Sequence, residues 1–162
     1  MIPVIVSGGL ALALSLFGTP LFIKFLVKKQ YGQFIRQDGP TSHHTKRGTP
    51  TMGGVVIIVA TVLGYFGASV VGYLRTGIGP SVSALLLLFL MVGLGFVGFA
   101  DDFTKITRQR SLGLSPLAKI LGQGGVGIAF TLLALNFPNS DGQTPASLNI
   151  SFVRDTALNL AF

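Results

Sequence analysis

Residues 76–100 read TGIGPSVSALLLLFLMVGLGFVGFA, and no charged side chain occurs in this stretch. A helix of about 20 residues crosses roughly 30 Å of hydrocarbon, so the stretch is long enough to span a bilayer. Three more uncharged runs of similar length lie elsewhere in the chain, at residues 2–23, 51–74 and 120–140. The sequence therefore predicts an all-α polytopic membrane protein. Its transmembrane helices are expected at about residues 2–26, 51–74, 79–100 and 116–137.

The composition of the whole chain agrees with a lipid environment. Of its 162 residues, 49% are hydrophobic and only 10% are charged, and the mean hydropathy is +0.69. Soluble domains carry about 25% charged residues, because their surface faces water. The absence of cysteine excludes disulfides, thiolate metal sites and cysteine nucleophiles. No basic residue precedes the first apolar run, so it resembles a retained helix more than a signal peptide.

The basic residues are concentrated in two segments between the apolar runs. Six of the 12 Lys and Arg lie in residues 24–47 and four in residues 105–119, against two elsewhere. Cytoplasmic loops of membrane proteins retain Lys and Arg. This bias predicts cytoplasmic loops at 27–50 and 101–115, an external amino terminus and an external tail at 138–162. It also accounts for the net charge of +7 without nucleic acid, which we do not expect as a partner.

Small residues at four-residue spacing predict close helix packing in the first two apolar runs. By contrast, Gly93, Gly95 and Gly98 match a dinucleotide-binding pattern but lie inside an apolar run, without the strand and helix start which that motif requires. We therefore reject nucleotide binding there. The two small-residue stripes are Ser7, Ala11, Ser15 and Thr19, and Ala60, Gly64, Ala68 and Gly72.

The tail after the fourth run alternates apolar and polar residues at Leu148, Ile150 and Phe152, which predicts a short external hairpin. The final apolar run, residues 157–162, is too short to span a membrane. We interpret the 162 residues as one truncated membrane domain.

Asp101 and Asp102 are the first candidates for chemistry, because carboxylates at the edge of an apolar helix are costly to place near lipid. Successive helical residues point about 100° apart, so the pair is not expected to grip one ion symmetrically. One could accept a proton or help neutralise a magnesium phosphate, while the other orients a basic residue or a water molecule. The alternative is that both only mark the membrane boundary, with Asp101 pairing with Lys105 four residues later. The residues alone leave both possibilities open.

The first basic loop has the composition of an anion site. Residues 39–54 combine glycines, threonine hydroxyls such as that of Thr49, and the charges of Lys46 and Arg47. An ordinary turn with a positive-inside anchor is the alternative. His43 and His44 lack the spacing of zinc ligands and are interpreted as loop donors.

The second basic loop places more cations near the two aspartates. Lys105 and Lys119 suit a bound phosphate and its metal, whereas the positive-inside bias accounts for Arg108 and Arg110.

Residues 42–54, SHHTKRGTPTMGG, and residues 98–105, GFADDFTK, closely resemble the phospho-N-acetylmuramoyl-pentapeptide transferase family. Residues 112–114 and 119–123 extend the match. The resemblance implies ten transmembrane helices in the bacterial inner membrane, with an external amino terminus. It also implies transfer of phospho-N-acetylmuramoyl-pentapeptide from its UDP carrier to undecaprenyl phosphate with Mg2+. Lipid I and UMP would be the products, in peptidoglycan synthesis.

The resemblance implies roles for individual residues. Asp101 and Asp102 match the acidic pair, for which the resemblance implies either deprotonation of the lipid phosphate or attack as a covalent nucleophile. We favour deprotonation as their catalytic task, because the lipid phosphate can attack directly. Substrate-phosphate binding is expected at Lys46, Thr49, Lys105 and Lys119.

No metal ligand is expected within this chain, because the family's magnesium-binding aspartate lies beyond the matched segments. The 162 residues alone are therefore expected to be inactive. Two alternatives are kept: a polyprenyl-phosphate N-acetylglucosamine-1-phosphate transferase, and a non-catalytic membrane helix bundle. A homodimer is left open.

Overall fold

The computed structural model of the chain describes residues 2–32, 50–139, 142–146, 149–151 and 155–159. These residues include four long helices, each long and apolar enough to cross a membrane. The predicted all-α membrane fold is thereby confirmed. The helices are α1 (Ile2–Lys28), α2 (Gly54–Thr76), α3 (Val82–Thr107) and α4 (Pro116–Asn136).

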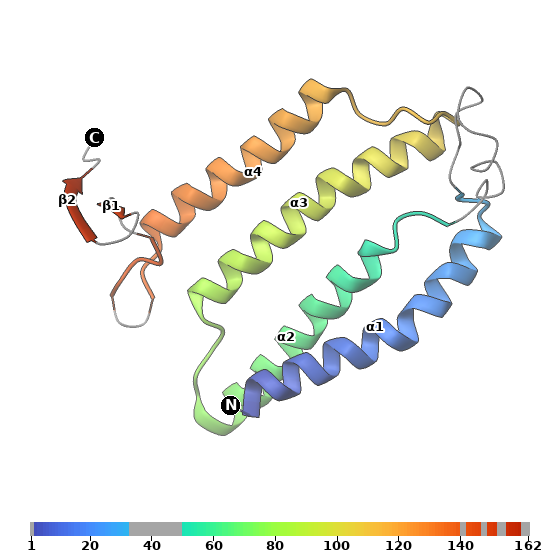
Figure 1. The fold of residues 1–162 in the computed structure, drawn as a ribbon. Helices are drawn as coiled ribbons and strands as arrows, with labels where there is room; N and C mark the ends of the chain where they lie inside the picture. The colour runs from blue at the N-terminus through green and yellow to red at the C-terminus, as the bar shows by residue number, and fades with distance from the viewer. Residues whose placement is uncertain (1, 33–49, 140–141, 147–148, 152–154, 160–162) are drawn as a thin grey trace.

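The helices form a single open layer in chain order, each antiparallel to the one before it (Figure 1). Across the described ranges, helix contacts join α1 with α2, α2 with α3, and α3 with α4. Large apolar side chains such as Phe17, Leu74 and Phe96 consequently remain exposed. Such a surface is stable when lipid or further apolar helices cover it.

The close packing that the small-residue stripes predict is present between α1 and α2. A Cβ added to Gly64 would lie 2.8 Å from Ala11 Cβ and 2.8 Å from the carbonyl oxygen of Ser7. Ala60 and Ala68 of the same stripe are buried. Only Gly72, at the end of the stripe, has open space around the position of a Cβ.

Glycines also bring α3 close to its two neighbours. Gly93 lies against Val126 of α4, and Gly95 lies against the Ile58 side chain of α2. Both glycines lie within the continuous helix α3, which supports rejecting the dinucleotide-binding pattern.

Side-chain caps mark the beginnings of the last two helices. Ser81 Oγ accepts a hydrogen bond from Ala84 N at 3.3 Å, and Ser115 Oγ accepts one from Ala118 N at 3.2 Å. Such caps satisfy backbone amides that have no partner within the helix.

The end of α3 corrects one expectation. We expected the helix to end near Ala100 and a loop to begin at Asp101, but the helix continues to Thr107. The change from apolar to charged residues marks the edge of the apolar surface, and neither Gly nor Pro occurs in residues 101–107 to stop the helix. Asp101, Asp102 and Lys105 are therefore helical.

A two-stranded antiparallel sheet follows α4, formed by β1 (Asn149–Ser151) and β2 (Asp155–Asn159). This is the hairpin that the alternation in the tail predicts, although Leu148 and Phe152 lie outside the described residues.

Candidate functional site

The aspartate pair and the described ends of the two basic segments lie at the same end of the layer. The antiparallel order brings together the last turns of α1 and α3 and the first turns of α2 and α4 (Figure 1). Gly32 and Pro50 pair in an isolated antiparallel bridge, so the connection from α1 to α2 leaves and returns at this end. We call it the charged end of the layer. Arg75 lies at the opposite end, in the last turn of α2.

Asp101, Asp102 and two lysines form a cluster at the charged end. Lys105 Nζ lies 2.8 Å from Asp101 Oδ2 and 2.8 Å from Asp102 Oδ1. Residues three and four positions apart share a helix face, which lets one lysine reach both carboxylates. Lys119 Nζ, from the first turns of α4, lies 3.0 Å from Asp101 Oδ1. The structure thus brings together four of the six predicted site residues.

The two carboxylates have different surroundings. The Asp101 side chain is 13% exposed, and its Oδ1 also accepts a hydrogen bond from Leu114 N at 2.8 Å. Three donors from α3, α4 and their connection therefore hold Asp101. The Asp102 side chain is 33% exposed and, among the described residues, forms its ion pair with Lys105. Asp101 is therefore the more shielded of the two carboxylates and is held by more donors.

Sequence reasoning missed the donor from the α3–α4 connection. Residues 112–114 extend the family resemblance, but nothing in their sequence shows that the amide of Leu114 points at Asp101. The nearest signal is the Ser115-Pro116 helix start that follows, since it fixes where the chain enters α4.

The remaining predicted site residues, Lys46 and Thr49, lie outside the described residues, as do His43 and His44. Pro50 leads into α2 through Met52, a buried residue with φ 69°. A non-glycine residue rarely adopts this left-handed conformation, and strained backbone is often found at functional sites. Thr51 Oγ1 is buried without a hydrogen-bond partner among the described residues.

The described residues contain no group of three or more His, Cys, Asp or Glu side chains able to hold a metal ion. Lys105 Nζ also occupies the position between the two carboxylates, where its charge would repel a divalent cation. The arrangement is suited to an anion, because a phosphate that displaced the Asp101 carboxylate would meet the ammonium groups of Lys105 and Lys119.

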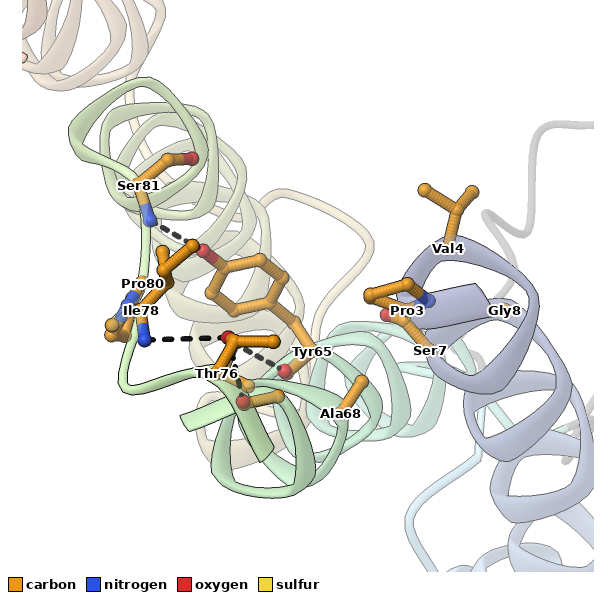
Figure 2. Close-up of a pocket in the computed structure, with 13 residues that line it drawn as sticks. Pro3, Val4, Ser7, Gly8, Tyr65, Ala68, Thr76, Ile78, Pro80 and Ser81 are labelled. Carbon is orange, nitrogen blue, oxygen red and sulfur yellow. Dashed lines mark hydrogen bonds between the residues drawn. The ribbon is translucent and has the colours of Figure 1, made fainter. Parts of the chain in front are cut away.

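A separate cavity of about 650 Å³ lies at the opposite end of the layer, between the start of α1 and the end of α2 (Figure 2). Its lining is mainly apolar. Tyr65 Oη accepts a hydrogen bond from Ser81 N at 3.2 Å, and Thr76 Oγ1 donates to the Gly72 carbonyl at 2.9 Å. No charged side chain lines the cavity, so it is not suited to a phosphate.

Comparisons with known proteins identify similar sequences for the segment before α2 and for the chain as a whole. Residues 46–58 match a protein-family model described as phospho-N-acetylmuramoyl-pentapeptide-transferase signature 1. This segment contains Lys46 and Thr49 and runs into the first turns of α2.

Curated proteins named phospho-N-acetylmuramoyl-pentapeptide-transferase match the entire chain or nearly so. The protein from Beutenbergia cavernae is 65% identical over 162 residues, which cover 100% of this chain and 44% of that protein. The Arthrobacter sp. protein is 62% identical over 165 residues, covering 100% and 45%. The Kineococcus radiotolerans protein is 62% identical over 160 residues, covering 98% and 43%. The chain therefore spans less than half the length of these relatives. No solved structure matches.

Proposed function

We propose that this chain belongs to the phospho-N-acetylmuramoyl-pentapeptide-transferase family and that its four helices are the amino-terminal part of such an enzyme. The similarity of its sequence to members of that family supports the proposal. The enzyme transfers phospho-N-acetylmuramoyl-pentapeptide from its UDP carrier to undecaprenyl phosphate and releases UMP and lipid I. The observation that carries this proposal is the cluster of Asp101, Asp102, Lys105 and Lys119, at the end of the layer where the signature segment enters α2.

The chemistry matches what such a cluster can do. An oxygen of the lipid phosphate forms a bond to the sugar-linked phosphorus, and the bond from that phosphorus to the oxygen of UMP breaks. Phosphoryl transfer depends on positioning and on neutralising charge around the phosphates. Lys105 and Lys119 supply charge from the described residues, and Lys46 and Thr49 are proposed to add donors. The aspartate pair is proposed to accept the proton of the lipid phosphate.

We propose that Mg2+ neutralises the diphosphate of the donor and that its ligands come from outside the described residues. The position of Lys105 between Asp101 and Asp102 supports this placement, because both carboxylates already form ion pairs with its ammonium group. Residues 1–162 alone are then expected to release no UMP. The test compares them with the full-length enzyme in the same detergent.

The membrane placement follows from the charge of the layer. We propose that the charged end faces the bacterial cytoplasm, where nucleotide-linked sugars are available, and that the amino terminus faces outside. The exposed apolar faces of the four helices then contact the inner membrane or further helices of the enzyme.

The proposal is tested with the full-length enzyme that carries this chain, reconstituted with undecaprenyl phosphate and Mg2+. UMP release from UDP-N-acetylmuramoyl-pentapeptide is expected, and Asp102→Asn should abolish most of it. Arg75→Gln, which removes a charge at the opposite end of the layer, is the control and should retain activity. Release only from UDP-N-acetylglucosamine would favour the N-acetylglucosamine-1-phosphate alternative, and release from neither donor would favour a non-catalytic bundle.

A further inference from the structure

Gly113 lies against Asp101 more closely than any other residue type could. A Cβ added to Gly113 would collide with Asp101 Oδ1, would lie 2.6 Å from Asp101 Cγ, and would lie 2.7 Å from the Asp101 carbonyl oxygen. Gly113 is not among the described glycines with positive φ, so its backbone conformation is open to alanine. The requirement for glycine is therefore one of space, and the space is filled by Asp101.

This close approach allows the connection to hold Asp101. The next residue, Leu114, donates its amide hydrogen to Asp101 Oδ1 at 2.8 Å. Ser115 then caps α4, and the first turn of that helix carries Lys119 to 3.0 Å from the same oxygen. If the connection moved away from α3 to admit a side chain at position 113, the amide and the ammonium group would both leave the carboxylate.

The donors from the connection also distinguish the two oxygens of Asp101. Lys105 alone could bridge the two aspartates while each carboxylate rotated about its side-chain bonds. With Leu114 N and Lys119 on Oδ1 and Lys105 on Oδ2, a single orientation satisfies all three donors. Fixed orientation matters, because a misplacement of about 1 Å can cost an enzyme on the order of a hundredfold in rate.

We propose that Gly113 is a positioning residue for Asp101, acting through the Leu114 amide and Lys119. The inference rests on the proposed transferase function, in which Asp101 belongs to the reacting pair. Gly113 does not touch substrate in this role. It sets the orientation of a carboxylate that does.

The first test is Gly113→Ala in the full-length enzyme. We expect kcat to fall on the order of tenfold to a hundredfold, with little change in KM for the UDP-linked donor. Gly79→Ala is the matched control, since Gly79 also lies in a connection between helices but has open space where a Cβ would be. The control should keep its kcat. Near-normal kcat in Gly113→Ala would overturn the proposal.

The second test asks whether Gly113 and Lys119 act through the same carboxylate. Gly113→Ala and Lys119→Met are combined, and kcat is measured for both single variants and the double variant. Since Gly113→Ala is expected to displace Lys119 as well as the Leu114 amide, Lys119→Met should remove little more, and the double variant should lose much less than the product of the two single losses. Full multiplication of the losses indicates independent structural effects and would overturn the proposal. If Gly113→Ala does not fold, Lys119→Met alone must still lower kcat, and a normal value contradicts the proposal.

A third test needs no turnover and therefore separates this inference from the proposed function. Lys119 is acylated with an amine-reactive reagent in detergent, and its labelling rate is compared with that of the exposed Lys28. Loss of the ion pair with Asp101 should raise the relative rate in Gly113→Ala but not in Gly79→Ala. An unchanged rate in folded Gly113→Ala overturns the inference even if the enzyme is active. An inactive wild type with the expected labelling would instead count against the transferase proposal.

Discussion

Asp101 and Asp102 are adjacent in the chain yet meet different partners. The angular separation of neighbours on a helix predicts different roles for them, and the structure gives Asp101 two lysines and a backbone amide while Asp102 pairs with Lys105. The ion pair between Asp101 and Lys105, which the sequence offers as the alternative to a functional role, is also present. The ion pair to Lys119 could not be predicted, because it depends on how α4 lies against α3.

At this scale we predict the effect of Asp101→Asn in the full-length enzyme. The asparagine oxygen can still accept the hydrogen bond from Leu114 N, so the connection should stay in place, but the charge that binds Lys105 and Lys119 is lost. Turnover should fall on the order of 10²–10⁴-fold, as when a group essential for proton transfer is removed. UMP release and thermal unfolding in detergent measure the two effects. Normal turnover would mean that Asp101 marks only the membrane boundary.

Helices show which parts of the fold follow from local sequence. Uncharged runs locate all four helices, because lipid selects for apolar side chains along the full span. Apolarity does not locate the end of α3, which continues through Asp101 to Thr107 until Arg108 caps it and Gln109 adopts φ 47°. Polarity and helix termination are separate signals, because the charges of Asp101 and Asp102 end the apolar run without ending the helix.

The interface between α1 and α2 gives a prediction for two glycines on one helix. In Gly64→Ala, the new Cβ would meet the backbone of Ser7 and Ala11, which cannot rotate away, so we expect destabilisation of about 1–3 kcal/mol. Gly72→Ala has open space and should be neutral or stabilising, because alanine favours a helix. Thermal unfolding in detergent measures both. Equal effects of the two changes would show that the small-residue stripe does not set the distance between the helices.

At the scale of the whole molecule, basic residues are concentrated at one end of the layer. The charged end holds the last turns of α1 together with Lys105, Arg108, Arg110 and Lys119, whereas Arg75 lies at the opposite end. The number of Lys and Arg in each loop predicts this asymmetry. The two basic loops are separated by two membrane crossings, so both lie on the same side. The close approach of the α3–α4 connection to Asp101 is a matter of tertiary contact, and counting charges does not reveal it.

Topology is tested at this scale by labelling in intact membranes. The chain has no native cysteine, so a thiol reagent modifies only the single cysteine that is introduced at Gln33 or Gln143. A membrane-impermeant thiol reagent should modify Gln143→Cys from outside and should reach Gln33→Cys only after the membrane is opened. Modification of both cysteines from one side would be incompatible with the proposed orientation.

The open layer also has a consequence for how the protein is made. Each described helix contacts only the helices that directly precede or follow it in the chain. Short sequence separation between contacting segments favours rapid folding, since little chain entropy is lost before contacts form. The close pair α1 and α2 can thus pack as soon as both helices have entered the membrane, and α3 and α4 can each join an existing edge. Synthesis from the amino terminus would build the layer in the order in which its helices emerge.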